Sequence, residues 1–302
     1  MSATHVTVWQ LRWHRLRADR AALLGAAVLL LLGLLALSAG LLESWLGVSG
    51  VETDLLGRFE PPSATHFLGT DDAGRDVLAR LLRGGQISLA IGVLGALGAS
   101  VVGTLIGATA GYARGWTDTV LMRLTDFVIG LPWLPMLIIL AALDLTKLGL
   151  PAAFVRSGGA NFWRIVAIFT LLGWTGVARL ARAGTIALAE RDFVQAARAQ
   201  GASPWRILRV HILPNAISPV IVATTLAMGR IILAESGLSF LGVGIQPPKT
   251  SWGSMLNNAL DLIGTAPALA IYPGLMILLT VVAINFLGDG LQAAFDPRND
   301  RR

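Results

Sequence analysis

The sequence predicts an all-α membrane protein with six transmembrane helices. Of its 302 residues, 54% are hydrophobic and only 14% are charged, whereas a soluble domain carries about 25% charged residues. A helix needs about 20 apolar residues to cross the hydrocarbon core of a bilayer, and six stretches meet that length. The chain has no cysteine, which excludes a disulfide scaffold and thiolate metal sites.

The apolar stretches divide the chain into spans and connecting segments. The predicted spans are 21–42, 86–111, 119–143, 165–182, 217–241 and 268–291. The remaining segments are an N-terminal segment (1–20), a long loop (43–85), a polar loop (183–216) and a tail (292–302). The five spans from 86 to 291 are expected to form one transmembrane domain.

The distribution of charge predicts the orientation. If both termini are cytoplasmic, the inner segments hold 15 Lys and Arg residues and the outer segments hold 8, as the excess of positive charge in cytoplasmic loops requires. Segment 43–85 is then extracytoplasmic. The net charge of +6 and the pI near 10.9 do not predict nucleic-acid binding, because the cations are scattered between apolar runs rather than gathered on one face.

Small residues and prolines are expected to shape individual spans. The second span carries a small residue at every fourth position (Gly95, Ala99, Gly103, Gly107 and Gly111), which allows the close approach of a neighbouring helix. That neighbour could belong to this subunit or to a moving interface. Pro132, Pro135 and Pro273 remove backbone donors inside spans, so kinks are expected there.

The loop 183–216 is the most informative polar segment. Phe193, Ala196, Ala197 and Gln200 recur at helical spacing, and Gly201 is placed to end that short helix. Pro204 is placed to begin a second helix, and Pro214 is expected to stop it before the fifth span. From the pattern alone, such a helical pair could be a solvated surface, lie on lipid headgroups or dock a partner.

Polar residues inside spans are costly and therefore suggest function. They are Asp126, Arg230, Glu235 and Asn285. Each could pair with a neighbour at an interface, or could line a translocation path. The dispersed histidines and the adjacent Glu190 and Asp192 form neither a metal site nor an acid–base pair, so no catalytic residue is predicted.

Several motifs resemble one transporter family. Gln195-Ala-Ala, three residues, Gly201, nine residues and His211-Ile-Leu-Pro214 is similar to the EAA motif of ABC-importer permeases, with Gln in place of Glu and His in place of Ile. The other matching stretches are Phe67-Leu-Gly-Thr-Asp-Asp-Ala-Gly-Arg-Asp-Val-Leu, Ala234-Glu-Ser-Gly-Leu-Ser-Phe-Leu-Gly, Gln246-Pro-Pro, Ser251-Trp-Gly-Ser-Met-Leu, Asn285-Phe-Leu-Gly-Asp-Gly-Leu and Phe295-Asp-Pro-Arg. Together they resemble the C-type permease subunit of dipeptide, oligopeptide and nickel ABC importers.

The resemblance implies the type I ABC importer permease fold in a bacterial inner membrane. It also implies partners: a second, homologous permease chain, two ABC ATPases that bind the ATP and Mg²⁺, and an extracytoplasmic solute-binding protein. This chain has no phosphate-binding glycine loop with its lysine, so it is expected to be a transport subunit and not the ATPase. By resemblance, the residues that couple it to the ATPase are Asp192, Gln195, Ala196, Ala197, Gly201, Ala202, Arg206, Leu213 and Pro214.

The expected function is to form half of a translocation pore for peptides. Nickel complexes and glutathione-like solutes remain alternative substrates. A secondary transporter would be expected to show an internal repeat and titratable groups at mid-membrane, and a membrane enzyme would need clustered polar residues near an interface. The polar loop 183–216 is accounted for by neither of these two classes.

Overall fold

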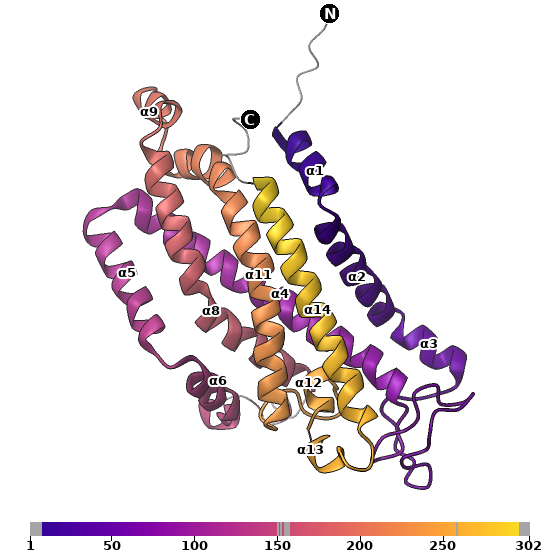
Figure 1. Cartoon of the computed structure of the whole chain (residues 1–302). Helices are drawn as coiled ribbons and strands as arrows, with labels where there is room; N and C mark the ends of the chain where they lie inside the picture. Colours follow the sequence, from indigo (N-terminus) through magenta and orange to yellow (C-terminus); the bar gives the residue numbers. More distant parts are fainter. Residues whose placement is uncertain (1–7, 150, 152, 154–157, 258, 296–302) are drawn as a thin grey trace, which may run out of the picture.

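A computed structural model describes residues 8–149, 151, 153, 158–257 and 259–295, and its long helices lie side by side along one direction (Figure 1). The five long helices are α2 (Arg20–Leu37), α4 (Val77–Ala113), α8 (Gly158–Ala189), α11 (Leu213–Phe240) and α14 (Ala268–Phe295). The shorter elements are α1 (Val8–Ala18), α3 (Ala39–Leu46), α5 (Gly115–Gly130), α6 (Trp133–Ala142), the 3₁₀ turn η1 (Leu145–Leu148), α9 (Asp192–Ala199), α10 (Pro204–Arg206), the π-helical turn η2 (Ile207–Ile212), α12 (Trp252–Met255) and α13 (Ala259–Leu262).

The number of apolar helices agrees with the predicted spans. Five helical segments of the described chain are long and apolar enough to cross a membrane, and α5 with α6 makes a sixth candidate if the bent pair is one span. The two members of that pair are inclined by 85°. The all-helical membrane architecture is therefore confirmed, but the predicted span 119–143 is not one continuous helix.

The break in that span has a local cause. Leu131, which precedes Pro132, has an extended backbone (φ −73°, ψ 135°), as expected where a following proline ring disfavours the α conformation. The expected interruption at Pro132 is therefore found. Pro135 lies in the first turn of α6, where a missing backbone donor costs little. Helix α14 continues through Pro273.

The start of α4 also differs from the predicted span. The helix begins at Val77, nine residues before the predicted limit at residue 86. Asp76 caps it by accepting a hydrogen bond from the backbone N–H of Ala79 at 2.8 Å. Val77 and Leu81 are buried against Trp252. The first two turns of α4 are thus part of the packed protein and not of a long loop.

The stripe of small residues on α4 packs against α8 of the same chain. A Cβ atom added to Gly103, Gly107 or Gly111 would overlap backbone carbonyl oxygens of α8. The helices are therefore as close as backbones allow, and the stripe is used for packing inside this subunit. Next to it, Phe169, Ile165 and Ile91 are fully buried in the main apolar core.

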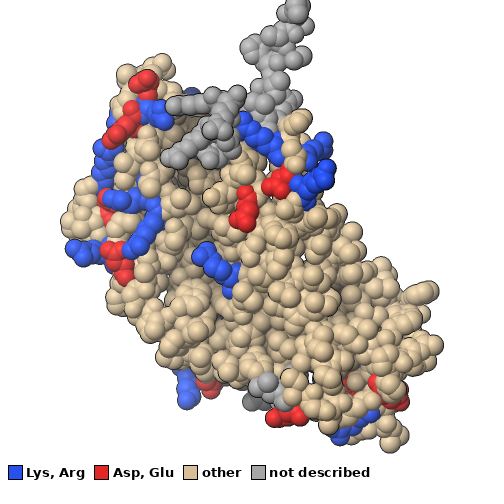
Figure 2. All heavy atoms as spheres, in the orientation of Figure 1, with Lys and Arg blue, Asp and Glu red and all other residues tan. Residues whose placement is uncertain are grey.

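The outer surface has the polarity expected of a protein in a bilayer. On the face that Figure 2 shows, charged side chains lie mainly toward the two ends, and most residues of the broad region between them are uncharged. On α2, Leu24, Leu30 and Leu37 are exposed by 65% or more of their area, as a lipid-facing surface would be.

The two ends of the molecule carry different elements. The beginning of α1, the end of α14 and the helix α9 lie at one end, which we call the α9 end (Figure 1). The segment between α3 and α4, together with α12 and α13, lies at the opposite end, which we call the α12 end (Figure 1).

Candidate functional site

At the α9 end, a short helix projects from the bundle on a small apolar anchor. Val194 of α9 is fully buried and packs with Ala189, Ile207 and Ile212. The Cζ atom of Arg198 lies 5.7 Å from the ring centre of Tyr112 at the end of α4, which is cation–π distance. Val194, Arg198 and the side-chain amide of Gln195 therefore attach α9, and most of its surface faces outward.

The sequence correctly predicted how α9 ends. Gly201 has a φ of +79°, a left-handed conformation that glycine adopts without steric cost. The N–H of Gly201 donates to the carbonyl of Arg198 at 3.0 Å, and the N–H of Ala202 donates to that of Ala197 at 3.1 Å. These two bonds are the Schellman arrangement. Gly201 and Ala202 thus have a structural role in the turn between α9 and α10.

The second helix departs from the prediction at its far end. Ser203 caps α10 through the backbone N–H of Arg206 at 3.3 Å, with Pro204 in the first turn, as expected. Pro214 does not stop the helix: residues 204–240 are continuously helical. The π-helical turn η2 precedes the proline, and the N–H of Leu213 donates to the carbonyl of Leu208, five residues back. This wider turn avoids the steric clash that a proline ring causes in an α-helix.

The nine predicted coupling residues fall into an exposed set and a partly buried set. The exposed ones are Asp192, Gln195, Ala196, Gly201, Arg206 and Pro214, and the partly buried ones are Ala197, Ala202 and Leu213. The side-chain amide of Gln195 donates to the carbonyl of Ala189 at 2.9 Å and so ties α9 to the end of α8. Phe193 and Trp205 expose 44% and 63% of their area beside this set.

The four polar residues predicted inside spans are not gathered into one site. Asp126 is exposed and pairs with Arg179 of α8 at 2.7 Å. Glu235 is fully buried, where its carboxylate accepts hydrogen bonds from Ser239 at 2.6 Å and Ser88 at 3.2 Å. Arg230 on α11 and Asn285 on α14 are exposed.

The buried carboxylate of Glu235 belongs to a network that closes the α12 end. The hydroxyl of Ser88 also accepts the backbone N–H of Trp252 at 3.1 Å, and the indole N–H of Trp252 donates to the carbonyl of Leu81 at 2.9 Å. These bonds join α4, α11 and α12. Glu235 therefore lies in a packed junction, and its predicted place on a translocation path remains a prediction.

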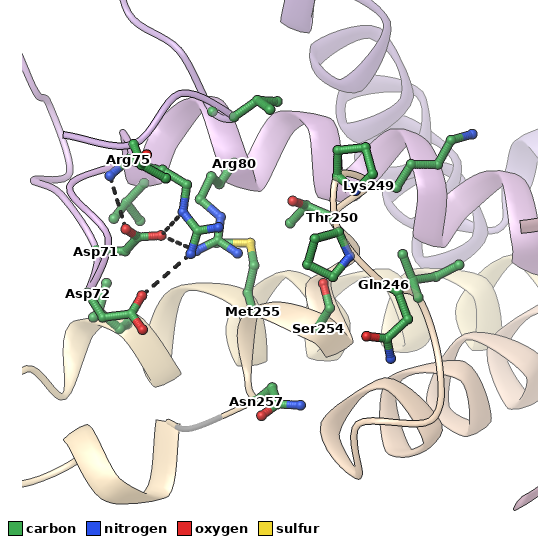
Figure 3. Close-up of a pocket in the computed structure, with 18 of the residues that line it drawn as sticks. Asp71, Asp72, Arg75, Arg80, Gln246, Lys249, Thr250, Ser254, Met255 and Asn257 are labelled. Atoms are coloured by element: carbon green, nitrogen blue, oxygen red, sulfur yellow. Dashed lines mark hydrogen bonds and ion pairs between the residues drawn. The ribbon is translucent and has the colours of Figure 1, made fainter. Parts of the chain in front are cut away.

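A cavity of about 660 Å³ opens beside this junction. One wall is the segment that leads into α4, and the other is the segment from Ile245 to Asn257 (Figure 3). The polar side chains that line it are Thr53, Asp71, Asp72, Arg75, Arg80, Gln246, Lys249, Thr250, Ser254 and Asn257. Its volume is within the range of about 300–1,000 Å³ that is usual for small-molecule sites.

Asp71 organises the first wall of the cavity. Its carboxylate accepts the backbone N–H groups of Ala73 at 2.8 Å and Arg75 at 3.0 Å, and both the Arg75 and Arg80 side chains pair with it. Burial alone would raise the pKa of Asp71, but the charge of Arg80 and the backbone donors outweigh burial and hold the pKa below its usual value.

The sequence alone did not predict this cavity. The stretches that begin at Phe67 and at Gln246 were noted as family motifs, yet they are about 170 residues apart and nothing in either one indicates contact. The one indication in the sequence is the expected topology, which places both stretches on the extracytoplasmic side of the membrane. Their meeting in one cavity is a result of the tertiary structure.

The fold and these two ends define a multi-span helical membrane subunit without a nucleotide-binding loop of its own. Residues 103–301 match the family described as the binding-protein-dependent transport system inner membrane component, and residues 7–62 match the N-terminal transmembrane domain of oligopeptide transport permease C. The chain belongs to this permease family, whose members are multi-pass inner-membrane transport subunits.

Individual relatives align along nearly the whole chain. The glutathione transport system permease protein GsiD of Pectobacterium atrosepticum is 38% identical, over 97% of this chain and 92% of that protein. The dipeptide transport system permease protein DppC of Bacillus subtilis is 38% identical, over 95% and 84%. In a structure of the methionine ABC transporter MetNI in an inward-facing conformation, a chain matches with a TM-score of 0.55 at 18% identity, covering 72% of this chain and 97% of that one. The type I permease fold is thereby confirmed.

Proposed function

We propose that this chain forms half of the translocation pore of an ABC importer for short peptides. The observation that carries the proposal is full-length similarity to permeases named for dipeptides and for glutathione, itself a tripeptide. A second, homologous permease chain forms the other half. An extracytoplasmic binding protein delivers the solute, and two ATPases hold the ATP and Mg²⁺.

The α9 end is the docking surface for the ATPases. Three features support this role: the exposed coupling residues, the exposed aromatic rings of Phe193 and Trp205, and the narrow attachment of α9. A short helix with few attachments can follow the closure of a partner and transmit it through α8 and α11, as helix shifts do in other switching proteins.

The proposed orientation places this end in the cytoplasm. Residues 1–20, 183–216 and 292–302 are then cytoplasmic, and segment 43–85 faces outward. The translocation path is lined in part by Arg230, whose exposed side chain on α11 has no polar partner within the described part of the chain.

A bulky substitution on the exposed face of α9 tests the coupling role. In Ala196→Trp the new side chain points away from the bundle and should block docking, so ATPase co-purification and ATP-driven uptake of a labelled dipeptide should both fall at least tenfold. Ala64→Trp, exposed at the α12 end, is the control and should keep both. Normal co-purification and uptake in Ala196→Trp would rule out α9 as the coupling element.

Single cysteines test the orientation, because the chain has none of its own. A membrane-impermeant maleimide should label Ala64→Cys in intact spheroplasts, and should label Ala199→Cys only after lysis. The reverse order of labelling would overturn the proposed topology.

A further inference from the structure

The cavity at the α12 end is lined by three cationic side chains, Arg75, Arg80 and Lys249, and by two carboxylates, Asp71 and Asp72. Both guanidinium groups, those of Arg75 and Arg80, converge on the carboxylate of Asp71 (Figure 3). That carboxylate already receives two backbone N–H groups, so its acceptor positions are filled. Asp71 is therefore a saturated acceptor that pairs with both guanidinium groups.

The other contacts of Arg75 and Arg80 leave some of their N–H groups without a close acceptor. Asp72, a more exposed carboxylate, lies 3.5 Å from Arg75 Nη2, which is long for a charge-assisted hydrogen bond. The buried Nε of Arg80 has no hydrogen-bond partner among the described residues. Arg75 keeps 22% of its side chain accessible, so a ligand can reach it. This wall is suited to a carboxylate, which pairs with guanidinium groups in a planar, bidentate manner.

The opposite wall offers acceptors for N–H groups. The amide nitrogens of Gln246 and Asn257 donate to the carbonyls of Gly242 at 2.7 Å and Ser239 at 3.5 Å. Within the described chain, their side-chain oxygens accept no hydrogen bond. Between the walls, Val51, Met255 and Leu269 supply apolar surface. The cavity thus combines a wall that carries two guanidinium groups, an opposite wall that carries amide oxygens and the Lys249 ammonium group, and apolar surface between them.

We propose that this cavity binds a short peptide, with the terminal carboxylate on Arg75 and Arg80 and the backbone N–H groups on Gln246 and Asn257. This inference rests on the proposed function and adds a solute site within the permease itself. Every unmodified linear peptide has one terminal carboxylate and a row of amides, so these contacts accept peptides regardless of side chain. The site lies at the end opposite to α9, where a solute would enter.

The test uses the purified transporter, with both permease chains and the ATPases, in nanodiscs without the binding protein. Trialanine and its C-terminal amide are titrated calorimetrically. We expect trialanine to bind and amidation to weaken binding about tenfold or more, as loss of a charge-assisted pair predicts. Equal binding of the two peptides, or no binding of trialanine, would overturn the proposal. Acetate should compete poorly; if it competes as well as trialanine, the cavity is a simple anion site and the peptide assignment is wrong.

Matched variants locate the binding. Arg75→Gln should lose about tenfold in affinity for trialanine, and Gln246→Ala, an exposed position, should lose a few-fold. Arg58→Gln removes the same charge from the same end but outside the cavity, and should bind as the wild type does. Unchanged affinity in both cavity variants would place the peptide elsewhere.

Uptake with the binding protein present separates this inference from the proposed function. If the complex imports dipeptides but shows no carboxylate-dependent binding, only the cavity site fails. If it imports no peptide at all, the substrate assignment fails as well.

Discussion

The two ends of this permease are built in opposite ways. At the α9 end, a helix of eight residues has one fully buried side chain, Val194, and presents most of its surface outward. At the α12 end, four residues at the core of the junction, Ser88, Glu235, Ser251 and Trp252, are almost wholly buried. The α9 end, which we propose docks ATPases that change conformation, is loosely attached to the bundle. The α12 end, which forms the wall of a cavity, is tightly packed. The following predictions test this contrast, from the largest expected effect to the smallest.

Removing Trp252 should have the largest effect on stability. Its side chain is 2% exposed and its indole N–H is hydrogen-bonded, so Trp252→Ala should lower the free energy of unfolding by about 3–5 kcal/mol. Trp205→Ala, 63% exposed at the α9 end, should change it by less than about 0.5 kcal/mol while weakening ATPase co-purification. Denaturant unfolding in detergent measures both. Similar destabilisation by the two variants would refute the contrast between the ends.

Asp71→Asn should destabilise the α12 end by about 1.5–3 kcal/mol, because two guanidinium groups lose their shared anion. The effect should depend on pH. Since the pKa of Asp71 lies below its usual value, the carboxylate stabilises the fold above about pH 4 and this contribution is lost as the pH falls through the lowered pKa.

Thermal unfolding of the wild type and Asp71→Asn from pH 7 to pH 3 measures this dependence. The difference between their melting temperatures should be constant near neutrality and should close in acid. A difference that widens on acidification would show that Asp71 is not an ionised partner of the two arginines.

Ser88→Ala should cost about 1–2 kcal/mol. The change leaves the buried N–H of Trp252 without its acceptor, but Glu235 keeps the hydroxyl of Ser239. Ser88→Thr, which keeps a hydroxyl, should not rescue the stability fully, since Ser88 is fully buried and the added methyl has little room. Ser44→Ala is the control and should unfold nearly like the wild type, because Ser44 is exposed on α3 and its hydroxyl donates only to the carbonyl of Leu41 in the same helix.

Ser203→Ala should have the smallest effect, a local loss of about 1 kcal/mol in the helix it caps. Hydrogen exchange should speed up in α10 and η2 while the global unfolding free energy stays nearly constant, because the α9 end is loosely attached. Ser203→Asp retains a capping oxygen and should restore slow exchange. Destabilisation of the whole protein by Ser203→Ala would mean that this end is as tightly integrated as the other.

Local features of the sequence predicted much of the fold. Hydropathy located the apolar helices, the spacing of small residues predicted the close approach of α4 to a neighbour, and Gly201 and Pro204 predicted the turn between α9 and α10. The expectation at Pro214 was wrong: the turn before it is π-helical, and the helix continues through the proline.

What the sequence by itself determined was therefore the membrane class, the apolar segments and the helix–turn–helix at the α9 end, because hydropathy and capping act over a few residues. The tertiary structure alone decided that Arg75 and Arg80 share one carboxylate and face Gln246 and Asn257 across a cavity. It also decided that Glu235 is buried in a network with Ser88. The two walls of the cavity are far apart in sequence, as are Ser88 and Glu235, and only the packing of α4 against α11 and α12 brings them together.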